Sequence, residues 1–289
     1  MDTRVSDRSI PLAVDLDGTL IAGDLLWEAV FGLLRKAPWC MFLFPGWLAR
    51  GKAVFKDEIF SRVELEPDAL AYRPQVVDWL EGEKAGGRTS ILATASCQNK
   101  AQQIADHLGL VAEVGCSDRM TNLKSKAKLD LLLERYGDGG FDYAGNSEDD
   151  VVVFDAARRA IVVAPDKAAN SWASDHDVTP MISPDRVSFK DIIKMLRVHQ
   201  WAKNLRIAVP AILDHQFFQF GSRVAIAGAF FAFSFLASSV YIFNDLFDLA
   251  MDRRHPTKSR RPLPAGRIMP ATGVKIAFGL IAAAATISF

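Results

Sequence analysis

The chain has 289 residues, half of which are apolar, and its 34 lysine and arginine residues balance 34 aspartate and glutamate residues. A net charge of zero excludes a protein dominated by a basic nucleic-acid-binding tail or by an acidic disordered segment, so we expect no nucleic-acid partner. Three cysteines without regular spacing exclude a disulfide framework and a cysteine-rich zinc site. The length suggests about two domains.

Strands and helices alternate along the first part of the chain. Short apolar runs predict strands at residues 10–15, 89–94, 141–144 and 160–163. Helical periodicity predicts helices at residues 25–34, 76–84, 124–135 and 151–157, and one that ends at 107. This alternation predicts βαβ units and a mostly parallel sheet. The mixed residues 166–187 are predicted to be a linker.

The second part of the chain contains two long apolar runs. Residues 224–243 carry no charge, and residues 271–289 are interrupted only by Lys275. A helix needs about 20 apolar residues to span a bilayer. We therefore expect membrane helices here, and because the second run reaches the last residue we expect the full protein to be longer.

The first predicted strand leads into two carboxylates. Asp15 and Asp17 would lie at the carboxyl edge of the parallel sheet, where open α/β folds bind their ligands. Gly18 permits the turn that lets both side chains face one site, and backbone N–H groups in such a turn can hold phosphate oxygens. A carboxylate beside a bound cation can act as a nucleophile toward phosphorus.

Residues 15–20, Asp-Leu-Asp-Gly-Thr-Leu, resemble motif I of the haloacid dehalogenase (HAD) superfamily. Three further motifs follow in the family's order, at Thr94, at Lys124 and at residues 145–150. The resemblance covers about residues 8–165. It implies an α/β Rossmann-like domain over residues 1–165 with a small helical cap at about 22–75.

The resemblance also implies roles for individual residues. Asp15 would be the nucleophile that forms an aspartyl-phosphate, and Asp17 would be the general acid and base. Thr94 would supply a hydroxyl to the phosphate, and Lys124 would balance the charge. The implied ligands of Mg²⁺ are Asp15, Asp17, Asn146 and Asp150.

Two positions qualify this resemblance. Motif IV usually opens with an acid, whereas this chain has Asn146, and an amide oxygen ligates Mg²⁺ without charge. A domain that keeps the fold without the chemistry is therefore the alternative. Lys128 could replace Lys124, and Asp24 lies where related phosphatases place an acidic residue that meets the substrate.

A second group of acids follows the run at 224–243. On a helix with 100° per residue, Asp245, Asp248 and Asp252 fall within about 60° of one another. Carboxylates at a membrane boundary indicate a functional site, and Mg²⁺ carrying a diphosphate is their natural partner. Six basic residues follow, which could bind phosphate oxygens and also favour a cytoplasmic loop. They are Arg253, Arg254, Lys258, Arg260, Arg261 and Arg267.

Residues 244–262, together with residues 196–204, resemble the first aspartate-rich motif of the UbiA-type prenyltransferase superfamily. The resemblance covers residues 188–289, as the first helices of an all-α membrane bundle, and is greatest to the polyprenyl-phosphate phosphoribosyltransferase branch. It implies a polyprenyl lipid, a diphosphate-bearing substrate, and Mg²⁺ on the three aspartates. The implied substrate-binding residues are Lys203, Asn204, Asn244, Arg253, Lys258 and Arg261.

These patterns predict an integral membrane transferase with a fused HAD-like phosphatase domain. No signal peptide precedes that domain, so we expect it in the cytoplasm, with crossings at residues 205–218 and 224–243 between it and the basic loop. The family's second aspartate motif has no counterpart in these 289 residues, so we expect no transferase activity from this chain alone. The alternative is an aromatic-substrate prenyltransferase with a regulatory HAD domain. A transporter, which would place its ion site at the midplane, fits less well.

One aromatic segment, residues 37–48, leaves two interpretations open. Its apolar stretch is too short to span a bilayer. It could dip into the membrane interface, where aromatic side chains are favoured. We favour packing inside the cap, which needs a core of its own.

Overall fold

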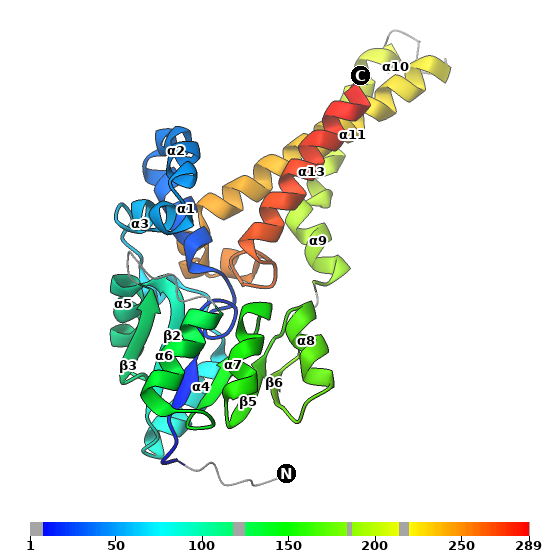
Figure 1. The fold of residues 1–289 in the computed structure, drawn as a ribbon. Helices are drawn as coiled ribbons and strands as arrows, with labels where there is room; N and C mark the ends of the chain where they lie inside the picture. Colours follow the sequence, from blue (N-terminus) through cyan, green and yellow to red (C-terminus); the bar gives the residue numbers. More distant parts are fainter. Residues whose placement is uncertain (1–7, 118–124, 184–186, 214–219, 289) are drawn as a thin grey trace. The chain divides into compact units, whose positions relative to one another are not determined.

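The computed structural model describes residues 8–117, 125–183, 187–213 and 220–288. It divides into two compact units, Met1–Arg186 and Val187–Phe289. We describe each unit by itself (Figure 1).

The first unit is built on a parallel sheet of six strands in the order β3-β2-β1-β4-β5-β6. The strands are β1 (Leu12–Val14), β2 (Ser90–Cys97), β3 (Glu113–Ser117), β4 (Asp142–Gly145), β5 (Arg159–Val163) and β6 (Thr179–Ile182). The central strands β1 and β4 are completely buried because helices cover both faces. The predicted α/β class is confirmed.

Successive side chains of β1 enter two different cores. Leu12 and Val14 belong to one apolar cluster, whereas Ala13 belongs to another, as expected for a strand that alternates between two faces. Helices α4 (Pro74–Ala85) and α5 (Gln98–Leu108) supply the first cluster. Helices α6 (Lys126–Tyr136), α7 (Val151–Ala156) and α8 (Lys167–Ser174) supply the second. Both faces of the sheet are therefore packed by helices (Figure 1).

The predicted linker at 166–187 differs from the structure, since most of it folds as α8 and β6. Asp166 caps α8 by accepting a hydrogen bond from the backbone N–H of Ala169, and β6 pairs with β5. Trp172 stacks on Phe154 with a centroid distance of 5.0 Å. A four-residue strand at the sheet edge with exposed and half-buried positions carries too little apolar pattern to be recognised. Strand β3 was not predicted from the sequence either.

A helical cap is inserted between β1 and α4, as expected. It consists of α1 (Leu25–Lys36), η1 (Pro38–Leu43), α2 (Phe44–Ala49), α3 (Lys52–Phe60) and η2 (Pro67–Ala69). The buried face of α1 is continuous with the core beneath the sheet. Lys56 also donates a hydrogen bond to the carbonyl of Ala95, just after Thr94. These contacts fix the cap on the carboxyl edge of the sheet.

The second unit is helical. Its elements are α9 (Phe189–Leu196), η4 (Val198–Ala208), α10 (Val209–Leu213), α11 (Phe220–Phe247), α12 (Leu249–Arg254), η5 (Lys258–Arg260) and α13 (Pro270–Ser288). Within the described residues, α11 and α13 are long and apolar enough to span a membrane, with mean hydropathies of 1.9 and 1.6. The two helices pack side by side (Figure 1). Of the crossing expected at 205–218, the described part forms only the end of η4 and the short α10.

Candidate functional site

The strand register of the first unit brings several predicted residues to one edge. Val14 pairs with Leu92 of β2 on one side and with Ala144 of β4 on the other. Asp15 follows Val14 directly, while Thr94 and Asn146 each lie two residues beyond the partners of Val14. All three therefore lie at the carboxyl ends of adjacent parallel strands, the position at which open α/β sheets bind ligands.

Gly18 shapes the turn after β1. Its φ is +80°, and a Cβ at this position would lie 2.2 Å from Nδ2 of Asn146. A side chain would therefore be strained and would also displace the Asn146 amide. The hydroxyl of Thr19 donates to Oδ1 of Asn146 at 3.3 Å, so the turn and motif IV are joined.

A buried lysine from α6 lies at the centre of this edge. Nζ of Lys128 is 2.8 Å from Oδ1 of Asp15, from Oδ1 of Asp150 and from the hydroxyl oxygen of Tyr143. These three acceptors use all three donors of an ammonium group. Lys124 lies outside the described residues, and among these residues Lys128 is the lysine that pairs with Asp15.

Asp150 holds this arrangement together. Its Oδ1 accepts from Lys128 and from the Tyr143 hydroxyl. Its Oδ2 accepts from the backbone N–H groups of Asn146 and Ser147 and from the Ser147 hydroxyl. Five donors saturate the two carboxylate oxygens. In the structure Asp150 therefore positions Lys128 and the turn after β4.

Negative charge exceeds positive charge at this edge. Burial raises the pKa of Asp15 from 3.8 to about 7; Lys128 opposes the rise, whereas Asp150 and Asp17 add to it. Burial lowers the pKa of Lys128, but Asp15 and Asp150 outweigh it and hold that pKa above its usual range. One lysine therefore does not fully compensate the carboxylates, and a further cation would be accommodated.

Two of the predicted acids accept hydrogen bonds from backbone N–H groups at the N-terminus of α1. Oδ1 of Asp17 accepts from the N–H of Leu25 at 2.7 Å. Oδ1 of Asp24 accepts from the N–H groups of Leu26 and Trp27 at 2.8 and 3.3 Å, so Asp24 is the N-cap of α1. An aspartate directly before an apolar helix is the sequence signal for this capping role. The family resemblance had instead suggested that Asp24 meets the substrate.

A divalent cation is the group that this donor set implies. Asp15, Asp17 and Asn146 offer the hard oxygen atoms that Mg²⁺ prefers, and the uncompensated charge on Asp15 fits a cation beside it. Among the described residues, no three His, Cys, Asp or Glu side chains converge as a ready metal centre. The fit therefore includes the amide oxygen of Asn146.

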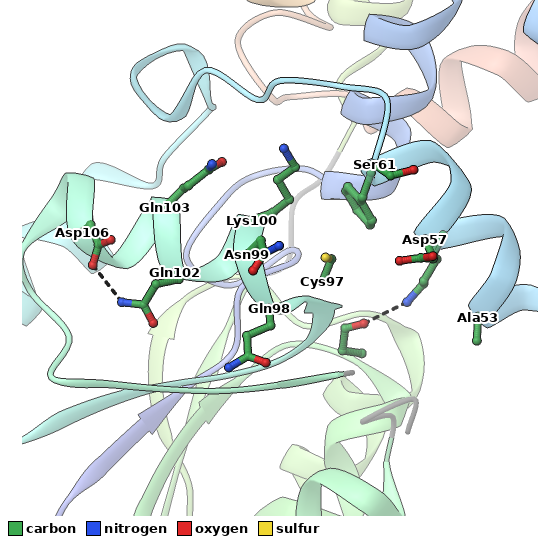
Figure 2. A pocket seen from close by; sticks show the side chains of 13 residues that line it. Ala53, Asp57, Ser61, Cys97, Gln98, Asn99, Lys100, Gln102, Gln103 and Asp106 are labelled. Atoms are coloured by element: carbon green, nitrogen blue, oxygen red, sulfur yellow. Dashed lines mark hydrogen bonds between the residues drawn. The ribbon is translucent and has the colours of Figure 1, made fainter. Parts of the chain in front are cut away.

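A cavity of about 620 Å³ lies between the cap and the end of β2. Figure 2 shows Gln98, Asn99 and Gln102 of α5 on one side of it. Asp57 of α3 and Ser61, which follows that helix, lie opposite. Most of these groups are amides and hydroxyls that hydrogen-bond in both directions. The cavity is thus suited to a polar, hydroxyl-bearing group.

The predicted aspartates of the second unit are paired with basic side chains. Oδ1 of Asp245 is 2.6 Å from Nη2 of Arg197 and 2.9 Å from Nη1 of Arg261. The same Nη1 is 2.8 Å from Oδ2 of Asp252, whose Oδ1 lies 3.2 Å from Nζ of Lys258. Asp245 and Asp252 are buried. We call Asp245, Asp252, Arg197, Lys258 and Arg261 the ion cluster.

The expected acids span two helical segments. Helix α11 ends at Phe247, and Asp248 has φ −102° and ψ 12° before α12 begins at Leu249. The N–H groups of Asp248 and Asp252 still bond to the carbonyls four residues before them. The structure brings Asp245 and Asp252 together, since Nη1 of Arg261 contacts both carboxylates. Arg197 was not foreseen; its backbone is left-handed (φ +51°), which the sequence did not indicate.

The remaining predicted residues make varied contacts. Asn204 donates to the hydroxyl of Ser234 in α11 at 3.0 Å. Arg253 donates to the carbonyl of Pro264 at 2.9 Å, which shapes the basic loop. Lys203 and Asn244 are exposed. In the structure, only Lys258 and Arg261 of the predicted substrate-binding residues belong to the ion cluster.

Solved structures similar to this chain include a predicted phosphatase from Clostridium acetobutylicum, with a TM-score of 0.45 and 15% sequence identity. The similarity covers 64% of this chain and 96% of that one.

Relatives by sequence include the uncharacterized protein y4nM of Sinorhizobium fredii, 36% identical over 94% of this chain and 53% of that protein. A decaprenyl-phosphate phosphoribosyltransferase of Mycolicibacterium smegmatis is 32% identical over 38% of this chain and 36% of that enzyme. The chain therefore spans about half the length of the first relative and about a third of the second.

A family comparison covers the end of the second unit. Residues 211–289 match the model of the UbiA prenyltransferase family. This family is membrane-integral, in agreement with the apolar helices α11 and α13. The second resemblance expected from the sequence is thus confirmed, over residues 211–289 of the C-terminal unit.

Proposed function

We propose that the first unit is a phosphohydrolase of the HAD type that uses Asp15 as its nucleophile. The observation that carries this proposal is the contact of Lys128 with Asp15 and Asp150 at the carboxyl edge of the sheet. A buried nucleophilic carboxylate needs a fixed cation beside it, because an incoming phosphate brings further negative charge.

The reaction takes place in two displacements. A carboxylate oxygen of Asp15 bonds to phosphorus, the bond between phosphorus and the leaving oxygen breaks, and Asp17 gives its proton to that oxygen. Water then attacks phosphorus while Asp17 takes back a proton, and inorganic phosphate leaves Asp15 free. Lys128 stays protonated throughout and offsets charge on Asp15 and the phosphate.

The other residues bind and orient the phosphate. Thr94 offers its hydroxyl from the end of β2, and the turn at Gly18 offers backbone N–H groups. Asp15, Asp17 and Asn146 would hold Mg²⁺, which supplies positive charge against the phosphate oxygens. The leaving group would occupy the cavity beside α5, next to Thr94.

Phosphate release from a generic phosphate monoester tests this proposal. Full-length protein in detergent, supplied with Mg²⁺, should release phosphate, and Asp15→Asn should abolish the release. Asp130→Asn is a matched control because Asp130 is an exposed aspartate on α6. Equal activity of the parent and Asp15→Asn, or no activity of the parent, would reject the assignment and favour a regulatory HAD domain.

We propose further that the second unit contributes to a transferase that handles a diphosphate donor and a polyprenyl lipid. The UbiA family match supports this, as do the acids and bases gathered beside the end of α11. The relative from Mycolicibacterium smegmatis suggests phosphoribosyl transfer to a polyprenyl phosphate. The first unit would then remove a phosphate from the lipid-linked product.

Two kinds of side chain in this unit match a metal–diphosphate pair. Asp245, Asp248 and Asp252 have the hard oxygens that Mg²⁺ prefers, and Arg261 and Lys258 can bind phosphate oxygens. Mg²⁺ would neutralise the diphosphate leaving group. Because Asp245 and Asp252 are ion-paired in the structure, we expect Arg261 and Lys258 to turn from carboxylates to phosphate when the ligand binds.

Calorimetric titration with inorganic diphosphate and Mg²⁺ tests this second proposal. The full chain in detergent should bind the pair, and Asp252→Asn should lose that binding. Asp191→Asn is the control, because Asp191 pairs with Arg267 outside the ion cluster. Unchanged binding in Asp252→Asn would reject the site.

A further inference from the structure

The outer surface of the cap is strongly apolar. Five large side chains of η1 and α2 are about half exposed or more, and we call them the cap patch. They are Trp39 (65% exposed), Met41 (53%), Phe42 (78%), Leu43 (47%) and Leu48 (50%). An exposed apolar patch of this kind in a folded protein marks an interaction surface.

Other side chains of the same segment are packed into the protein and hold it in place. Cys40 and Trp47 are buried in the core of the first unit. The ring of Phe44 packs edge-on against Phe55 at 5.4 Å and lies 5.7 Å from the ring of Trp47. The packing inside the cap that we favoured therefore accounts for only part of the segment, and the cap patch is fixed in its outward position.

The chain segment that carries the cap patch is basic, although Arg50 pairs with Glu58 just beyond it at 3.3 Å. Residues 29–56 contain no acidic residue and five basic ones. The basic residues are Arg35, Lys36, Arg50, Lys52 and Lys56. The first four are exposed, and they flank the patch on both sides along the chain. Aromatic side chains bordered by cations suit the headgroup region of an anionic bilayer, where rings enter the interface and cations meet lipid phosphates.

We propose that the cap patch docks on an anionic lipid bilayer, with Trp39 and Phe42 in its interfacial region. The chain itself supplies the reason for a bilayer as the partner. Helices α11 and α13 are apolar enough to span a membrane, and residues 211–289 match a membrane-integral family. The first unit is thus always tethered near lipid, and the flanking charge complements anionic headgroups. This contact does not depend on phosphohydrolase activity.

Lipid quenching of a fluorophore at the cap patch tests the proposal. The full chain, with Cys97→Ser and Cys116→Ser, is labelled with an environment-sensitive dye at Phe42→Cys and reconstituted into anionic vesicles that contain quencher-bearing lipids. Asp138→Cys is the matched control, because Asp138 is exposed in the turn before β4, at the opposite edge of the sheet. Thermal melting identical to that of the parent verifies the fold of both labelled proteins.

We expect a blue-shifted emission and several-fold stronger quenching at position 42 than at position 138. Lys36→Glu with Lys52→Glu should weaken the quenching at 42, whereas Lys126→Glu, an exposed lysine on α6, should not. Equal quenching at the two positions would overturn the proposal. So would a label at position 42 that is shielded from water but untouched by the lipid quencher, since this indicates a protein partner.

Discussion

The amino edge and the carboxyl edge of the parallel sheet differ in the cations that surround their buried aspartates. At the amino edge, Asp142 begins β4 and accepts hydrogen bonds from Arg88 and Arg158, both bonds of Arg158 being 2.8 Å long. At the carboxyl edge, Asp15 and Asp150 share the one cation of Lys128. Asp142 thus has two cationic partners, of which Arg88 also contacts Glu83 at 3.3 Å. Asp15 and Asp150 have one cationic partner between them.

The pKa values follow this difference. Despite its burial, the hydrogen bonds and charges of Arg158 and Arg88 lower the pKa of Asp142. Burial, only partly offset by Lys128, raises that of Asp15 to about 7. A buried carboxylate whose charge is fully paired stabilises a fold. A buried carboxylate whose charge is only partly paired can bind a metal cation and react with a phosphate. The ion pairs of Asp142 therefore stabilise the sheet, whereas the carboxyl edge has the charge imbalance that the proposed phosphohydrolase needs.

Removing Asp142 should have the largest effect on stability. Asp142→Ala removes the carboxylate that Arg88 and Arg158 share and leaves buried Arg88 with Glu83 alone, at 3.3 Å, which costs about 3 kcal/mol of the free energy of unfolding. Urea denaturation of the protein, followed by tryptophan fluorescence, measures the loss, and Asp130→Ala serves as the exposed control. A loss of similar size in both variants would remove the distinction between the two edges.

Removing Lys128 should instead abolish activity while the fold persists. Lys128→Met should lower the phosphate release rate by about 10²–10³-fold, because no cation then faces Asp15 and the phosphate. The pKa of Asp15 should also rise further, which moves the acidic limb of the pH–rate profile to higher pH. Lys128→Arg keeps the charge and should recover part of the rate. A wild-type rate in Lys128→Met would mean that another cation performs this role.

The two edges should also give opposite pH dependences of stability. Folded Asp15 has a pKa of about 7 against 3.8 in an unfolded chain, so the folded state binds its proton more tightly and this contribution to stability falls as pH rises from about 4 to about 7. The lowered pKa of Asp142 stabilises the fold above its unfolded pKa, and this stabilisation is lost as pH falls through the folded value.

Denaturation of metal-free protein at about pH 5 and about pH 8 separates these contributions. Asp15→Asn should flatten the decline of stability between these pH values and should be more stable than the parent at the higher one. Asp130→Asn should keep the parent's slope. An unchanged slope in Asp15→Asn would show that Asp15 is ionised throughout this range.

The smallest expected effect concerns the metal. Asn146→Asp adds a charged oxygen at the carboxyl edge and should lower the Mg²⁺ concentration for half-maximal activity by roughly tenfold. The hydrogen bond from Thr19 to Oδ1 of residue 146 can persist, since a carboxylate also accepts. Weaker Mg²⁺ dependence in this variant would argue against residue 146 as a ligand.

Reasoning from strand ends predicted that Asp15 lies at the carboxyl edge, because it follows an apolar run in a parallel sheet. Thr94 and Asn146 were assigned through the family resemblance, and the strand register places them beside Asp15. The sequence did not decide between Lys124 and Lys128, because spacing alone does not show which lysine of the predicted helix at 124–135 contacts Asp15. The saturation of Asp150 was equally hidden, because it arises from Tyr143 and from backbone N–H groups of its own turn.

The second unit shows a different limit. Its apolar runs predicted α11 and α13, since length and hydropathy are local properties. Helical spacing also placed Asp245 and Asp252 near each other, and in the structure both contact Arg261. Arg197 reaches Asp245 from 48 residues away, a contact that no local pattern encodes.

The three hydrogen bonds of Lys128 have a consequence for the timing of the proposed reaction. Tyr143 and Asp150 orient its ammonium group before any substrate arrives. The ammonium group is therefore oriented when the chain folds, and little reorganisation remains for the moment of phosphoryl transfer. A loose lysine on the surface would have to lose its side-chain freedom in every turnover, whereas this one has lost it once.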